Sequence, residues 1–129
     1  MSGEIDLEAF EAGAFDLCAF DHRDHLRMGF ELARRAPFTE AANRFAAALR
    51  QITARTGQPE RYHDTITVAF MALIAERLGE DRDQPFEAFE RANPDLFDRK
   101  VLTRWYDEAR LNSAAARRAF VLPGGERPA

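Results

Sequence analysis

Apolar residues recur at helical spacing along most of this 129-residue chain, and no stretch sustains the every-second-residue alternation of a half-buried strand. Each such helix has an apolar side that must be buried against a neighbour. Three longer amphipathic segments with short connections predict an all-α fold, a compact antiparallel bundle of about four to six helices. A chain of this length supports one core, so we expect 1–129 to form a single domain.

Proline, glycine and capping residues predict where the longer helices begin and end. The first follows Asp21, a good N-cap with Asp24 at the third helical position, and Pro37 stops it. Thr39 is expected to cap the second, residues 40–56. The third is expected over residues 60–78, after a proline and before a glycine.

Shorter elements are expected after residue 79. One short helix lies between Pro85 and Pro94, and Asp95 is expected to cap a further helix in which aromatic and apolar residues recur up to Trp105. Ser113 is expected to cap the last one. We divide the chain into an N-terminal arm (1–19), a core bundle (20–122) and a tail (123–129). Phe120, Val121 and Leu122 are too apolar for a free end, so this segment is expected to pack back onto the bundle.

The composition argues against several classes of partner. The net charge of −4 disfavours nucleic acid, because phosphates require a positively charged face. No apolar run reaches the roughly 18 residues of a membrane span. The acidic N-terminus does not resemble a secretory signal, so we expect the cytoplasm. A single cysteine, Cys18, permits no internal disulfide. No glycine-rich loop indicates a nucleotide cofactor.

The chain has three histidines, and all three fall on predicted inward sides of helices. At 100° per residue, His22 and His25 both lie along the apolar side that carries Leu26, and His63 lies on the same side as Phe70. A neutral imidazole can be buried and offers a nitrogen lone pair. Helical residues three apart lie about 5–6 Å apart at Cβ, close enough to share an ion. The sequence therefore predicts a metal site made of His22, His25 and His63.

Three nitrogen ligands suit a divalent transition metal such as Zn, Fe, Ni or Cu, and leave positions open for water or substrate. Glu60, one turn before His63 on the predicted helix, is the candidate fourth ligand or base. Tyr62 is the other catalytic candidate, and Thr67 could hydrogen-bond a metal-bound water or a ligand. Asp21 could orient one of the histidines through a hydrogen bond without itself binding the metal.

Arg117 and Arg118 precede the apolar C-terminal segment, and they are candidates to reach the mouth of a pocket and pair with an anionic group. Solvated arginines on a short helix are the alternative interpretation.

Two functional classes follow from these residues. The first is a metal-binding helical protein with a three-histidine site, and at its fullest a small metalloenzyme acting on a small molecule. The second is a non-enzymatic ligand-binding or accessory protein, in which the histidines are structural or form hydrogen bonds in a pocket. The sequence leaves open the choice between them, the identity of a small-molecule ligand, and whether a homo-oligomer forms.

Three segments, FDHRDHL, YHDTIT and ARRAFVLP, resemble a group of small all-helical bacterial proteins that share FxHxxHL, YHxTxT and ARRxFxLP segments. The resemblance covers about residues 20–123. It implies that the histidine segments and the C-terminal segment belong to one design, and it implies no activity.

Overall fold

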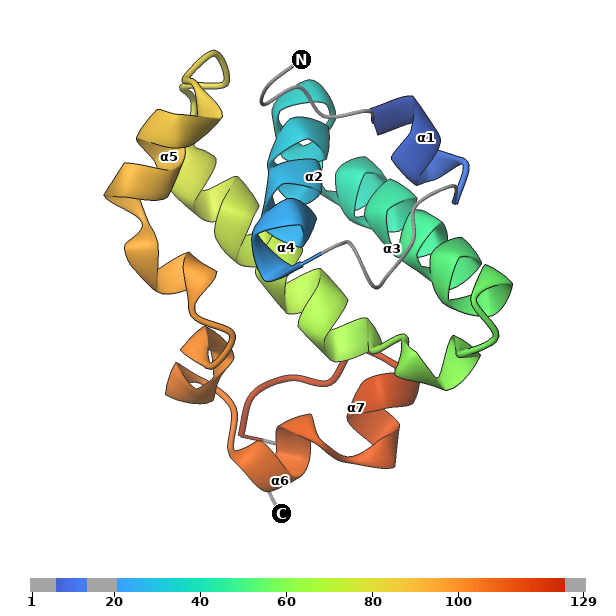
Figure 1. The fold of residues 1–129 in the computed structure, drawn as a ribbon. Coiled ribbons are helices and arrows are strands. Elements are labelled where there is room, and N and C mark those ends of the chain that lie inside the picture. Colours follow the sequence, from blue (N-terminus) through green and yellow to red (C-terminus); the bar gives the residue numbers. More distant parts are fainter. Residues whose placement is uncertain (1–6, 14–20, 125–129) are drawn as a thin grey trace.

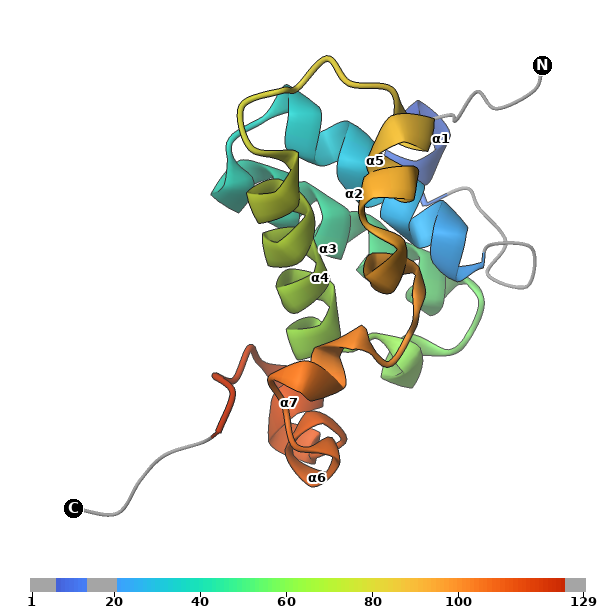
Figure 2. The same ribbon diagram turned by 90° about the vertical axis from the view of Figure 1, so that its left-hand side faces the viewer.

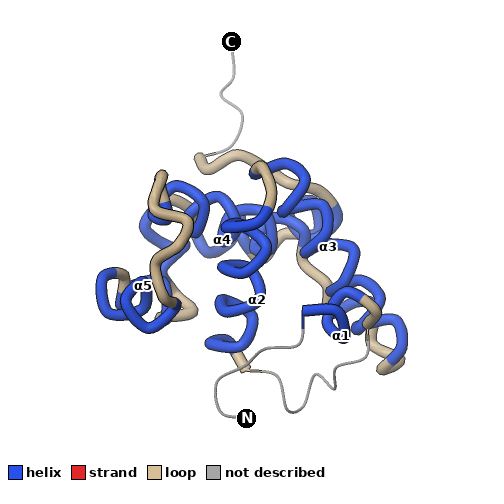
Figure 3. The backbone as a smooth tube through the Cα atoms, turned by 90° about the horizontal axis from the view of Figure 1, so that it is seen from above, coloured by secondary structure: helices blue, strands red, loops and turns tan. Residues whose placement is uncertain are grey.

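The computed structural model describes residues 7–13 and 21–124, and in these residues the chain is all-α, as predicted. They contain α-helices and short 3-10 helices but no strand (Figure 3). The predicted 1–19 arm and 123–129 tail lie mostly outside the described residues. The elements, in chain order, are α1 (Leu7–Glu11), α2 (His22–Arg35), α3 (Phe38–Arg55), η2 (Pro59–Arg61), α4 (Asp64–Leu78), α5 (Phe86–Ala92), η3 (Pro94–Phe97), η4 (Val101–Arg104), α6 (Glu108–Leu111) and α7 (Ala114–Arg118).

Helix α4 lies at the centre of the molecule and contacts α2, α3, α7 and η4 (Figure 1). Its Phe70, Met71 and Ile74 are buried, as expected for a helix that other elements surround. Gly29 allows α2 to approach α4 closely. A Cβ at this position would lie 2.9 Å from both Ile74 Cδ1 and Met71 Sδ, shorter than normal van der Waals contact.

The start of α2 is as predicted, whereas the starts of the next two helices differ. Helix α3 begins at Phe38 rather than after Thr39, because the Pro37 carbonyl already accepts the first helical hydrogen bond, from Ala41 N. The predicted 60–78 helix is interrupted. Only η2 forms before Tyr62, whose backbone is extended, and α4 starts at Asp64 with His63 as its N-cap.

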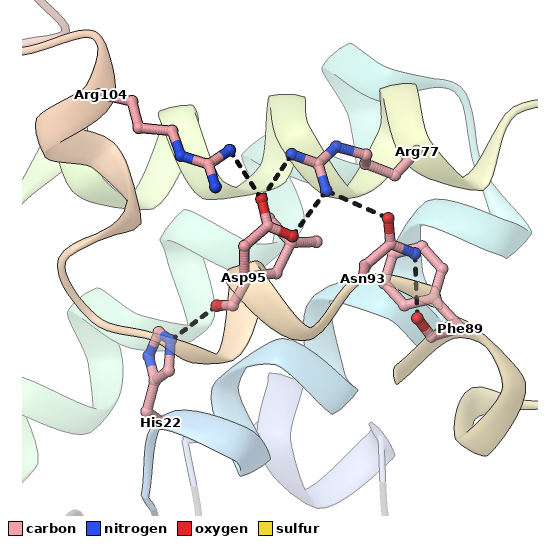
Figure 4. A network of polar contacts seen from close by, with 7 residues as sticks. His22, Arg77, Phe89, Asn93, Asp95 and Arg104 are labelled. Atoms are coloured by element: carbon pink, nitrogen blue, oxygen red, sulfur yellow. Dashed lines mark hydrogen bonds and ion pairs between the residues drawn. The ribbon is translucent and has the colours of Figure 1, made fainter. Parts of the chain in front are cut away.

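The helix predicted to follow Asp95 does not form as one element. The chain makes two separate 3-10 turns, η3 and η4, and Trp105 is 45% exposed instead of buried. Asp95 does not act as a helix cap, because arginines bind its carboxylate. Arg77 of α4 forms two hydrogen bonds to it, both 2.9 Å long, and Arg104 forms a third, also 2.9 Å (Figure 4).

This arginine–aspartate network fastens η3 and η4 to the central helix. The hydrogen bonds from Arg77, together with the positive charges of Arg77 and Arg104, lower the pKa of the Asp95 carboxyl to about 2. Arg77 also donates to Asn93 Oδ1, and Asn93 in turn donates to the Phe89 carbonyl of α5 (Figure 4). Bidentate arginine–carboxylate pairs are directional, so the network defines how this segment docks.

The C-terminal helices lie at the N-terminal end of α4 (Figure 2). Ser113 caps α7 as predicted, by accepting a hydrogen bond from Ala116 N. The segment after α7 packs back only in part. Val121 packs against the core, and its N–H donates to Thr65 Oγ1. Phe120 and Leu122 are 43% and 67% exposed, so the prediction that their side chains pack onto the bundle is wrong.

None of the described helices is both long enough and apolar enough to cross a membrane. The cytoplasmic location expected from the sequence stays a prediction.

Replacing Gly29 with valine tests the close packing of α2 on α4. Because the new side chain would overlap Ile74 and Met71, Gly29→Val should lower the free energy of unfolding by about 1–3 kcal/mol, measured by urea denaturation. Ala47→Val is the control, since Ala47 is exposed on α3 and carries only the helix-propensity cost of a β-branched residue. Equal losses in the two variants would contradict the close approach.

Candidate functional site

The first turn of α2 is held by a capping box that positions two of the histidines. The Asp21 carboxylate accepts a hydrogen bond from Asp24 N at 2.9 Å, and the Asp24 carboxylate accepts one from Asp21 N at 3.1 Å. Asp21 therefore acts as a helix cap, and its carbonyl holds the ring of His25. The carboxylate of Asp21 is engaged in the cap, and the contact with His25 is made by the backbone oxygen.

His22 links α2 to η3. Its Nε2 lies 3.0 Å from the Leu96 carbonyl oxygen (Figure 4), and its ring makes an edge contact with Phe70 of α4. A carbonyl can only accept, so Nε2 carries the proton and donates. Burial lowers the pKa of His22 below its usual value, and this ring is neutral at pH 7.

His25 is tied to the start of its own helix. Its Nδ1 donates to the Asp21 carbonyl oxygen at 3.1 Å, so the proton lies on the opposite nitrogen from that of His22. The pKa of His25 is lowered to about 4, mainly by burial, and the positive charge of Arg99 contributes in the same direction. The ring is therefore neutral over the physiological range.

His63 uses both ring nitrogens in structural hydrogen bonds. Its Nδ1 accepts from Ile66 N at 3.2 Å and so caps α4. Its Nε2 donates to the Leu111 carbonyl oxygen of α6 at 2.7 Å. Burial lowers the pKa of His63, and the positive charge of Arg117 adds to the effect. This buried, neutral ring thus links the central helix to the C-terminal helices through hydrogen bonds.

The three histidines line one cavity, of about 340 Å³, between α2, α3 and α4; we call it the histidine cavity. Its walls are mostly apolar. The six apolar residues are Leu26, Phe45, Leu49, Ile66, Phe70 and Ile74, and the polar ones besides the histidines are Thr53, Thr67, Tyr62, Arg61 and Arg99. The predicted convergence of the histidines on one space therefore agrees with the structure.

Sharing a cavity is less demanding than sharing a metal ion. No set of three or more His, Cys, Asp or Glu in the described part of the chain is placed so that it could hold a metal. In addition, both nitrogens of His63 and the Nε2 of His22 already have backbone hydrogen-bond partners. Metal binding by His22, His25 and His63 stays a prediction, and it requires these bonds to rearrange.

Of the other candidates, Tyr62 and Thr67 line the histidine cavity, but their hydroxyls already have partners. Tyr62 donates to Asp64 Oδ1 at 2.6 Å, and burial together with this bond raises its pKa. Its phenol is therefore a poor proton donor to other groups and a poor base near pH 7. Thr67 donates to the His63 carbonyl at 2.7 Å.

Glu60, Arg117 and Arg118 do not line the histidine cavity. They line a separate, open depression of about 320 Å³, together with Arg50. Arg117 donates to the Glu60 carbonyl at 3.0 Å. Glu60 lies away from His63 because the chain between them is not helical, and the helical wheel that placed it beside the histidine assumed an unbroken helix.

Sequence reasoning did not identify Arg61 and Arg99 as site residues, although both line the histidine cavity and are exposed. Arg61 was detectable by position, since it precedes Tyr62 and His63. Arg99 was not, because it reaches the cavity through the η3–η4 connection, whose path the expected helix misrepresented.

No family model matches the chain, and neither curated proteins nor solved structures give a significant match.

Two variants of His63 separate its two hydrogen bonds. His63→Ala should lower the free energy of unfolding by about 2–4 kcal/mol, because it removes the N-cap of α4 and leaves the Leu111 carbonyl unpaired. His63→Asn, which keeps a good N-cap, should recover roughly 1 kcal/mol of this loss. Urea denaturation checks both values. If both variants are as stable as the wild type, the hydrogen bonds of His63 do not hold α6 to α4.

The lowered pKa of His25 predicts a pH dependence of stability. The unfolded chain takes up a proton near pH 6.5 but the folded protein only near pH 4, so the stabilisation is complete above about pH 6.5 and is lost as the pH falls toward 4. Between pH 7 and 4 the wild type should lose roughly 2–3 kcal/mol more than His25→Gln, measured by urea denaturation at each pH. Identical losses would show that His25 titrates normally.

Proposed function

We propose that this protein binds a small, predominantly apolar organic molecule in the histidine cavity, and that its histidines serve as neutral structural and hydrogen-bonding groups. The carrying observation is that one cavity between the three longest helices collects all three histidines among apolar side chains, with each imidazole already bonded to the backbone.

The size and lining of the cavity support ligand binding. Small-molecule sites have volumes of about 300–1,000 Å³, mostly apolar walls and a few polar groups that orient the ligand. The histidine cavity, at about 340 Å³, falls at the lower end of this range. The apolar walls would supply most of the affinity, because binding removes the ligand's apolar surface from water.

Binding is favoured over catalysis by what the candidate catalytic groups do. Glu60 lies in another depression, and the Tyr62 hydroxyl donates to Asp64. A metal centre would require His63 to give up one of its two hydrogen bonds, to Ile66 N or to the Leu111 carbonyl, because the ligating nitrogen offers its lone pair to the metal. One equivalent of transition metal in tag-free protein, lost in His63→Ala, would favour the metalloprotein instead.

Filling the cavity tests the proposal. A fragment library is screened against ¹⁵N-labelled protein, and the amide signals of Leu26, Leu49 and Ile66 should shift with the fragments that bind. Ile66→Trp should weaken those fragments at least tenfold, because the larger side chain occupies the cavity.

Leu73→Trp is the matched control. Leu73 is on the same helix and is also partly buried against the core, but it does not line the cavity. It should leave fragment affinity within about twofold of the wild type while carrying a similar packing cost. If no fragment shifts the cavity signals, or if the two variants bind equally well, the proposal is wrong.

A further inference from the structure

The histidine cavity has an unbalanced charge. Two guanidinium groups, those of Arg61 and Arg99, line it, and none of the described residues that line it is acidic. The whole chain has the opposite bias, with 22 acidic against 18 basic residues. The histidines add nothing to this positive charge, because their lowered pKa values keep the imidazoles neutral.

Arg99 differs from most arginines in the described part of the chain, because its side chain has no hydrogen-bond or ion-pair partner there. Many of the others are neutralised by carboxylates, as in the pairs Arg23–Glu90, Arg44–Glu11 and Arg77–Asp95. Within residues 7–13 and 21–124, the Arg99 side chain forms no hydrogen bond and no ion pair. The neighbouring Asp98 carboxylate accepts a hydrogen bond from Lys100 N. The Arg99 guanidinium therefore keeps all its donors for a ligand.

The two arginines come from different segments of the chain. Arg99 follows η3, which contacts α2, and its charge acts on both His22 and His25. Arg61 is the last residue of η2, immediately before Tyr62, and the only hydrogen bond of its guanidinium to a described residue goes to the neutral Gln58 side chain, at 3.0 Å. A cavity with apolar walls and exposed cations concentrates the positive potential at its opening.

We infer that the ligand of the histidine cavity is a small molecule with an apolar body and an anionic head group, and that Arg99 binds this head at the exposed rim. This inference rests on the proposed function and specifies the class of ligand. Guanidinium binds carboxylate and related oxyanions through paired, charge-assisted hydrogen bonds. Arg61 adds longer-range attraction, while the apolar body occupies the space bordered by Leu49, Ile66 and Phe70.

A matched pair of probes isolates the head group. Octanoate and octanamide have the same alkyl chain and differ in charge at neutral pH. In titrations followed by NMR or calorimetry, wild-type protein should bind octanoate at least tenfold more tightly than octanamide. Raising the salt concentration from 0.05 to about 0.5 M should reduce this preference, because the rim arginines are exposed and screened.

Variants assign the preference to a residue. Arg99→Gln should weaken octanoate about tenfold or more and leave octanamide unchanged, and Arg61→Gln should weaken octanoate by a smaller factor. Arg91→Gln is the control. This substitution removes the same charge from an exposed position, but Arg91 does not line the cavity. It should change neither affinity more than about twofold.

The outcomes separate this inference from the proposed function. If both probes bind the cavity equally and Arg99→Gln has no effect, the anionic head is wrong and the apolar ligand site stands. If Arg91→Gln weakens octanoate as much as Arg99→Gln does, the effect is one of net charge, and the assignment to Arg99 is overturned. If neither probe binds at millimolar concentration, both claims are overturned.

Discussion

The packing of α4 between α2 and α3 is the contact on which the rest of the structure depends. Gly29 removes the side chain that would keep α2 away from Ile74 and Met71, so the two helices meet closely at that level. The histidine cavity lies between the same three helices, nearer the start of α4. The short C-terminal elements are too small to fold alone, and they are held to this core.

Polar bonds perform much of that attachment, and two histidines take part. His22 reaches η3 and His63 reaches α6, each through a hydrogen bond to a backbone carbonyl, while Asp95 binds Arg77 of the central helix. An unpaired buried carbonyl would cost about 1–3 kcal/mol, which gives these rings a structural role independent of any ligand. The same bonds hold the imidazoles at the cavity wall in their neutral forms.

Helical periodicity and capping chemistry were enough to predict the all-α class, the start of α2 directly after Asp21 and the convergence of the histidines on one cavity. They were not enough to predict where the helices are interrupted. His63 has the spacing of an interior helical residue, but its ring accepts the Ile66 N–H and begins the helix instead. Asp95 was expected to cap a helix that contains Arg99, but its carboxylate binds Arg77 and Arg104 instead. The chain around Arg99 forms separate turns, and only the folded structure shows that Arg99 lines the cavity.

The central claim, that hydrogen-bonded neutral imidazoles line a common cavity, is tested most directly by the tautomers of the three rings. Long-range ¹H–¹⁵N correlation spectra of the histidines at pH 7 report which nitrogen carries the proton. The structure predicts protonated Nε2 in His22 and His63 and protonated Nδ1 in His25, all neutral. Imidazolium signals, rapid averaging of both tautomers, or a proton on Nδ1 of His63 would contradict it.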